Sequence, residues 1–103
     1  MKHTIWRAAA RGDVDRLRTL LEPESECAVD ARDDFGRTAL MLAAEHNHAE
    51  AVAILLAAGA SVAAADDESG YTALHRALLH ARLEAAAVIV REGGASVDAP
   101  ADR

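Results

Sequence analysis

Apolar side chains recur along the chain at helical spacing. Three triples share the spacing i, i+3, i+4, namely Leu17/Leu20/Leu21, Val52/Leu55/Leu56 and Ala86/Ile89/Val90. In an α-helix this spacing places the three side chains on one face, so each triple predicts an amphipathic helix. The longest apolar stretch, residues 51–62, is interrupted by glycine and serine and falls short of the ~20 residues that a membrane-spanning helix needs. We therefore predict packed amphipathic helices and no transmembrane segment.

The same pattern returns at a fixed interval. The segment 34–40 (DFGRTAL) is similar to the segment 68–74 (ESGYTAL), and their shared glycine, threonine and leucine are 34 residues apart. A helical triple follows each segment, and a third triple stands one period earlier. A period near 33 residues indicates stacked supersecondary units that bury a continuous core between neighbours. We predict one domain, residues 1–103, made of three units at approximately 3–30, 33–66 and 67–99.

Residues 33–60 resemble the ankyrin repeat. They read DDFGRTALMLAAEHNHAEAVAILLAAGA, and the family pattern is DxxGxTPLHxAAxxGHxxxVxxLLxxGA. The third unit keeps Gly70, Thr72, Leu74 and His75 of this pattern, whereas the first lacks this opening, as amino-terminal capping repeats often do. The resemblance implies an all-α solenoid of stacked helix-turn-helix units joined by β-turn or hairpin loops. Helices are then expected near residues 4–11, 14–22, 38–46, 49–58, 72–80 and 83–92.

Local chemistry at the helix ends agrees with this arrangement. Thr38 and Thr72 precede apolar helical positions, where a hydroxyl accepts a hydrogen bond from a first-turn N–H and contributes ~1 kcal/mol. Between the paired helices the family prefers glycine, and this chain has Gly12, Asn47 and Ala81. Asparagine tolerates the left-handed backbone region, whereas alanine costs roughly 1 kcal/mol there. We therefore expect the third unit to have the least favourable turn and to fray first.

Composition sharpens the picture of the core. Apolar residues make up 51% of the 103 residues, but aromatic residues only 3%. The core must come from aliphatic side chains, with alanine as the spacer between close helices. The first residues contain no continuous apolar run, so we expect no secretory signal and an intracellular, cytoplasmic protein. Cys27 is the only cysteine, which excludes an internal disulfide and a CxxC zinc site.

Charge and motifs argue against several function classes. The 11 basic and 17 acidic residues give a formal net charge of −6, so we expect no nucleic-acid partner. The chain has no GxSxG, HExxH or phosphate-binding GxxxxGK[ST] motif. His46 and His48, with Glu45 nearby, could hold a metal only if another ligand came from elsewhere. His75 occupies the family position whose imidazole usually bonds the neighbouring turn. We predict neither an enzyme nor a metal site nor a cofactor.

The resemblance implies a protein-binding surface instead. In the ankyrin family, partners are usually held on the concave side, by the projecting turns and the exposed side of the first helix of each unit. The matching turn residues here are Arg32, Asp34, Phe35, Arg37, Asp66, Glu68, Ser69 and Tyr71. The matching helix residues are Ala10, Arg11, Glu45, His46, Leu79 and His80. We expect Phe35 and Tyr71 to anchor the partner, because aromatic side chains in a polar rim tend to dominate binding energy.

Alternatives stay open at this point. Phe35 could pack on the adjacent turn instead of binding, and we expect Trp6 to pack in the amino-terminal cap. Besides a protein-interaction module, the chain could be a scaffold segment of a longer array, or a small regulatory or immunity protein that inhibits a partner. Self-association is expected through the carboxyl-terminal repeat, whose outer helix should expose Leu83, Ala87 and Val90. The partner cannot be identified, because repeat surfaces vary independently of the scaffold.

Overall fold

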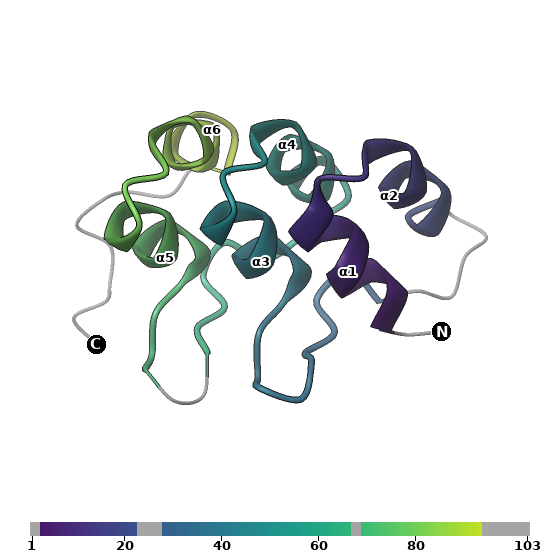
Figure 1. The fold of residues 1–103 in the computed structure, drawn as a ribbon, viewed down its shortest axis with the longest axis horizontal. Helices are drawn as coiled ribbons and strands as arrows, with labels where there is room; N and C mark the ends of the chain where they lie inside the picture. Colours follow the sequence, from purple (N-terminus) through teal and green to yellow (C-terminus); the bar gives the residue numbers. More distant parts are fainter. Residues whose placement is uncertain (1–2, 23–27, 67–68, 94–103) are drawn as a thin grey trace.

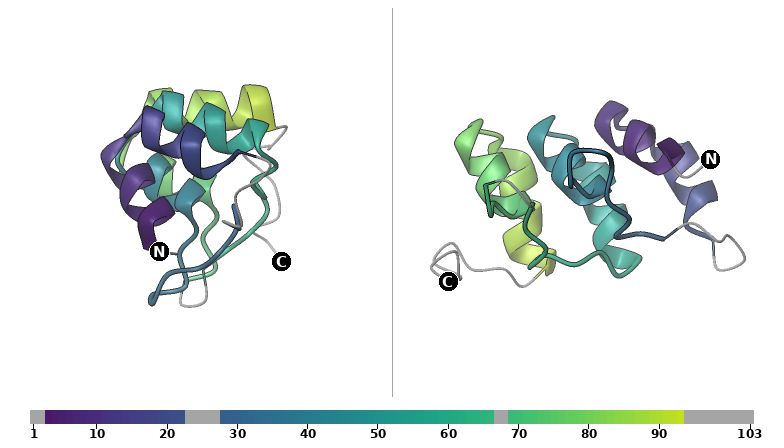
Figure 2. Two further views of the ribbon diagram at one scale, coloured as in Figure 1. Left: turned by 90° about the vertical axis from the view of Figure 1, so that its right-hand side faces the viewer. Right: turned by 90° about the horizontal axis from the view of Figure 1, so that it is seen from below.

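The computed structural model describes residues 3–22, 28–66 and 69–93. They contain the α-helices α1 His3–Arg11, α2 Val14–Leu20, α3 Ala39–Glu45, α4 Ala49–Ala57, α5 Ala73–Leu79 and α6 Leu83–Gly93. Consecutive helices pair into hairpins that stack side by side (Figure 1). The helices α1, α3 and α5 form one layer and α2, α4 and α6 a second (Figure 2). The expected all-α solenoid is confirmed, and each predicted helix end lies within two residues of the observed end.

The core lies between the two layers and between neighbouring hairpins. Helix α3 is central, packs against α1 and α5, and is buried from Ala39 to Ala44. Its alanines allow the helices of the first layer to approach closely. Leu17, Leu55 and Ile89, one from each predicted triple, are fully buried and fill the space between the layers. The aliphatic core expected from the composition is therefore confirmed.

Threonine caps begin the second and third hairpins. Thr38 Oγ1 accepts a hydrogen bond from the Met41 N–H at 3.3 Å, and Thr72 Oγ1 accepts one from the His75 N–H at 3.3 Å. The Thr72 N–H in turn donates to His75 Nδ1 at 3.1 Å. His75 therefore stabilises the start of its own helix rather than bonding the neighbouring turn. Both predicted caps are confirmed.

The tight turn within each hairpin contains one residue in the left-handed backbone region. The φ angles are 70° at Gly12, 61° at Asn47 and 56° at Ala81. At Gly12 a side chain is excluded twice, because a Cβ atom would also lie 2.7 Å from Nδ1 of His48. At Ala81 the side chain leaves the backbone strained, since the Cβ atom meets the following carbonyl group in this region. The prediction that the third hairpin has the least favourable turn residue agrees with these angles.

Candidate partner-binding surface

The loop before α3 forms a turn organised by Asp33. The Asp33 N–H donates to the Arg37 carbonyl at 2.9 Å, and the Asp33 carboxylate accepts from the N–H groups of Phe35 and Arg37, each at 2.9 Å. The Arg37 guanidinium completes the turn with an ion pair to Asp33 at 3.0 Å. Burial alone would raise the pKa of Asp33, but these hydrogen bonds outweigh it and lower that pKa below its ordinary value. The turn is thus fixed around an ionised carboxylate.

Phe35 projects from this turn into solvent. Its side chain is 65% exposed, and the Arg37 guanidinium carbon lies 5.0 Å from the centre of its ring, a cation–π arrangement. Phe35 therefore packs on its own turn rather than on the adjacent one. Trp6 behaves differently, since it is half-buried against the core and its Nε1 donates to the Ala31 carbonyl at 2.8 Å. The expected packing role of Trp6 is confirmed.

Asp66 plays the same part before α5, in a turn that is one residue longer. Its N–H donates to the Tyr71 carbonyl at 3.0 Å, and its carboxylate accepts from the Ser69 N–H and from Ser69 Oγ, the latter at 2.8 Å. The Tyr71 N–H in turn donates to Ser69 Oγ at 3.2 Å. Tyr71 is 41% exposed, and its ring lies 5.7 Å from that of His75. The third turn therefore also presents an aromatic side chain from a fixed backbone.

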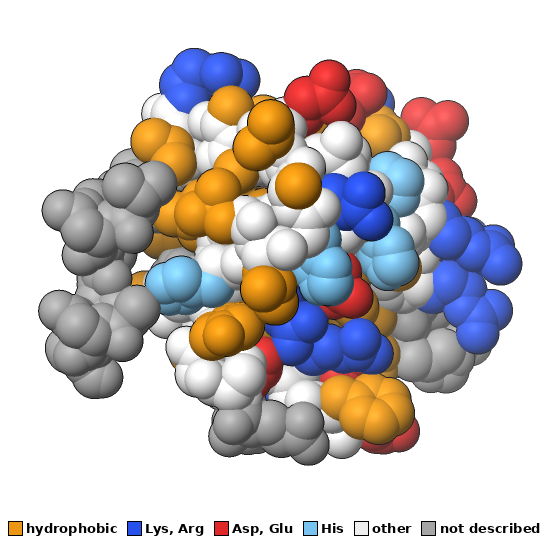
Figure 3. Space-filling view, turned by 60° about the vertical axis from the view of Figure 1, so that its left-hand side comes forward, with side chains coloured by type: hydrophobic (Ala, Val, Ile, Leu, Met, Phe, Trp, Pro, Cys, Tyr) orange, Lys and Arg blue, Asp and Glu red, His pale blue; other side chains and the backbone are white. Residues whose placement is uncertain are grey.

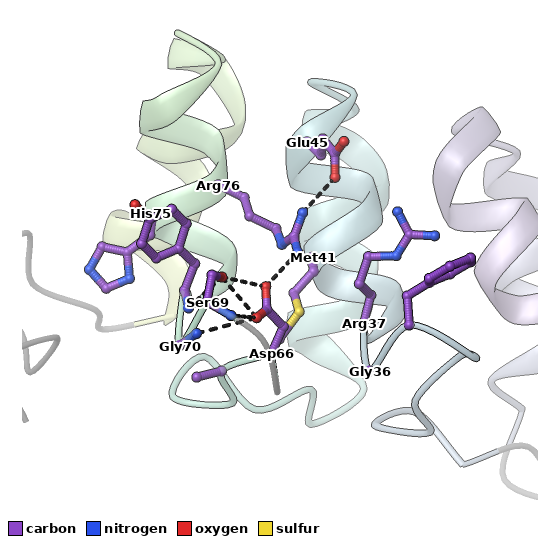
Figure 4. A network of polar contacts seen from close by, with 12 residues as sticks. Gly36, Arg37, Met41, Glu45, Asp66, Ser69, Gly70, His75 and Arg76 are labelled. Carbon is purple, nitrogen blue, oxygen red and sulfur yellow. Dashed lines mark hydrogen bonds and ion pairs between the residues drawn. The ribbon is translucent and has the colours of Figure 1, made fainter.

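Arg76 ties this turn to the preceding hairpin (Figure 4). One guanidinium nitrogen bonds the carboxylate of Asp66, and the other bonds Glu45 Oε1 at the end of α3 at 2.9 Å. Burial of Asp66 would raise its pKa, but the hydrogen bonds from Ser69 and Arg76 lower that pKa to about 2. The sequence prediction missed Arg76. Its signal was a charged residue where the second repeat has the buried Leu42, 34 positions earlier.

The remaining predicted residues divide into two groups. Arg32 bridges two turns, because its Nη1 donates to the carbonyl oxygens of Gly36 and Ala65, each at 2.8 Å. Arg32, Arg37, Glu45 and Ser69 thus maintain the shape of the surface. The exposed residues are Arg11, Asp34, Phe35, His46, Tyr71, Leu79 and His80. Glu68 lies outside the described residues.

Three exposed residues occupy the same place in successive repeats. Arg11 ends α1, and His46 and His80 are the residues that terminate α3 and α5. Basic side chains are favoured there, because the carboxyl end of a helix carries partial negative charge. Figure 3 shows arginine and histidine side chains interspersed with hydrophobic groups on the face that includes the α5/α6 end. The surface is mixed rather than uniformly charged.

The histidines near the α3–α4 turn are arranged for structure. The His46 and His48 rings lie 6.2 Å apart, and His48 Nε2 makes a hydrogen bond with the Ala10 carbonyl at 2.9 Å. Within residues 3–22, 28–66 and 69–93, three or more His, Cys, Asp or Glu side chains do not come together as a metal site. In the same part of the chain, the helices are too short or too polar to cross a membrane.

Comparison with known families decides the identity of the fold. A family model described as ankyrin repeats, three copies, matches residues 5–101. The chain belongs to the ankyrin-repeat family. The departures from the family pattern therefore have structural meaning, as at Ala81, where this ankyrin-repeat chain has alanine in the left-handed region.

One solved structure similar to this ankyrin-repeat chain contains a protein complex. It is described as the predatory endopeptidase Bd0816 from Bdellovibrio bacteriovorus in complex with the immunity protein Bd3460. A chain in that structure matches with a TM-score of 0.81 and 28% sequence identity. The match covers 91% of this chain and 47% of that one, so this chain spans about half the length of its structural neighbour.

Proposed function

We propose that this chain binds a partner protein through the surface formed by its projecting turns and the exposed ends of α1, α3 and α5. Ankyrin repeats generally mediate protein–protein interaction, and the structural neighbour comes from a protein complex. The observation that carries the proposal is the exposure of Phe35, at 65%, on a turn already fixed by Asp33. A preorganised aromatic side chain binds with little loss of conformational freedom.

Tyr71 supports the same surface from the next turn. Like Phe35, it is an exposed aromatic residue in a chain with few aromatics, and its backbone is held by the Asp66 turn. Leu79 adds an exposed apolar side chain on α5, and His46 and His80 add polar contacts. An apolar or aromatic centre with a polar rim is the usual anatomy of a protein interface.

Affinity capture with quantitative mass spectrometry tests this proposal. The wild-type chain is compared with the double variant Phe35→Ala/Tyr71→Ala and with Leu83→Ala, a matched control that truncates an equally exposed apolar residue on another face. We expect one captured protein to fall by about tenfold or more with the double variant and to stay unchanged with Leu83→Ala. Equal capture by the double variant and the wild type would reject the surface.

A second candidate function is inhibition of an enzyme by occlusion. The similarity to a chain from an endopeptidase–immunity protein complex favours it. If the captured protein is an enzyme, its activity is measured with and without the wild-type chain. Inhibition that disappears with Phe35→Ala/Tyr71→Ala would support this candidate. Binding without any change in activity would reject inhibition and leave the binding proposal standing.

A further inference from the structure

The end of the stack formed by the third repeat carries an apolar face outside the proposed binding surface. Leu78 lies on α5, and Leu83, Ala87 and Val90 lie on α6, and all four are exposed. The spacing i, i+4, i+7 places the three α6 residues on one side of the helix. Figure 3 shows hydrophobic side chains gathered over this end of the molecule. A contiguous apolar row of this kind marks an interaction site, whereas scattered apolar residues do not.

The corresponding positions of the second repeat are those that meet the third repeat. Ala44 and Ala49 stand 34 residues before Leu78 and Leu83, and Ala44 is fully buried. Asn47 makes polar links across the same contact, because its side chain donates to Glu84 Oε1 at 3.2 Å and accepts from the Ala85 N–H at 3.1 Å. These residues are small or form specific hydrogen bonds.

The third repeat differs at the same positions. It has Leu78 for Ala44, Leu83 for Ala49 and Ala81 for Asn47. Leucine in place of alanine prevents backbones from approaching as closely, and the alanine at 81 cannot cap a following helix. The face is therefore not shaped to receive another repeat in the geometry with which the second repeat receives the third.

The charges on α6 indicate what the face does fit. Glu84 lies in the first turn of α6 and Arg91 in the last turn, and both are exposed. Around the helix the two positions differ by only about 20°, so both lie along one edge of the apolar row. If two copies of α6 pack antiparallel about a twofold axis near Ala87, Glu84 of each copy lies beside Arg91 of the other. Ala87 at the crossing point allows close approach.

We propose that Leu83, Ala87 and Val90, with Leu78 beside them, form a homodimer interface in which α6 packs antiparallel against α6 of a second copy. A twofold interface uses one patch twice, so the patch must be complementary to itself in shape and charge. The apolar row and the Glu84/Arg91 edge satisfy this condition. Phe35 and Tyr71 lie on the turns, outside the row, so a dimer would present two partner-binding surfaces.

Sedimentation velocity of the full chain, from low micromolar to near-millimolar concentration, tests the interface. The wild type should show a concentration-dependent monomer–dimer equilibrium. Leu83→Glu should weaken the dimer by about tenfold or more, because the twofold axis buries the new carboxylate twice. The matched control Leu79→Glu, also an exposed leucine but outside the row, should leave the equilibrium unchanged. Thermal melts followed by circular dichroism verify that each variant is folded.

A charge exchange tests the antiparallel orientation. Glu84→Arg alone and Arg91→Glu alone each place like charges together and should weaken the dimer, whereas the double variant should restore it. A wild type that stays monomeric at every concentration would overturn the proposal. A dimer that survives Leu83→Glu would also overturn it, as would a double variant that is as weak as the single variants.

Discussion

In the second repeat the turn aspartate, Asp33, pairs with Arg37 four residues away in the same turn. In the third repeat the corresponding Asp66 pairs with Arg76, which also bonds Glu45 of the preceding hairpin. Both carboxylates accept backbone hydrogen bonds that shape the turn, and both have a lowered pKa. The difference is where the countercharge comes from, and it makes the third turn dependent on the second hairpin.

The contacts between hairpins show the same relation. His48 Nε2 bonds the Ala10 carbonyl at 2.9 Å, and Arg82 Nε donates to the Glu45 carbonyl at 2.8 Å. His48 and Arg82 hold matching positions in their hairpins, as do Ala10 and Glu45 in the hairpins before them. The repeat thus conserves the place of a contact within the chain while the side chain that makes it changes.

Removal of the countercharges should break this comparison most strongly. Arg76→Ala leaves Asp66, whose side chain is 3% exposed, as a buried carboxylate without its cation, and we expect a loss of about 3 kcal/mol in unfolding free energy. Arg37→Ala should cost about 1 kcal/mol, because Asp33 keeps its backbone donors. Urea unfolding measures both variants. Equal losses would show that the third turn does not depend on the second hairpin.

Acid should separate the two turns next. The pKa of Asp66 is about 2 in the folded chain against an ordinary 3.8, so the unfolded chain takes up the proton more readily. The stabilisation, about 2 kcal/mol at neutral pH, is complete above about pH 5 and disappears as the pH falls toward 2. Urea unfolding over this range should show a weaker pH dependence for Asp66→Asn than for Asp33→Asn. The opposite order would contradict the stronger interaction of Asp66.

The hairpin turns offer a smaller test. Ala81→Gly should raise the unfolding free energy by about 1 kcal/mol, since glycine adopts the φ of 56° without strain. The control Ala87→Gly, at an exposed position inside α6, should lower it by about 1 kcal/mol. Thermal or urea melts distinguish the two. A loss of stability in Ala81→Gly would mean that the alanine is not strained.

The smallest effect on stability is expected at the exposed aromatic residues. Phe35→Ala should change the unfolding free energy by less than about 0.5 kcal/mol, because the ring lies outside the core. Tyr71→Ala should cost slightly more, as it loses its contact with His75. A loss of several kcal/mol at Phe35, measured by urea unfolding, would assign the ring a structural role and weaken the binding proposal.

The parts of the fold that depend on local sequence could be predicted. The apolar triples, the caps at Thr38 and Thr72 and the left-handed residue at Ala81 each follow from a few neighbouring residues. The pairing of Arg76 with Asp66 and Glu45 spans 10 and 31 residues and depends on how the hairpins stack. Arg32 matched a binding position in the family pattern, yet its guanidinium bridges two turns. A pattern locates such side chains on a surface but does not decide whether they bond within the molecule.

Site-specific photocrosslinking in the cells that make this protein tests the binding surface most directly. A photoreactive phenylalanine analogue replaces Phe35 in one variant and Ala57, exposed at the end of α4, in another. We predict one dominant crosslinked protein from position 35 that position 57 does not yield and that unlabelled wild-type chain competes away. The same products from both positions, or none from position 35, would contradict a partner-binding surface at the turns.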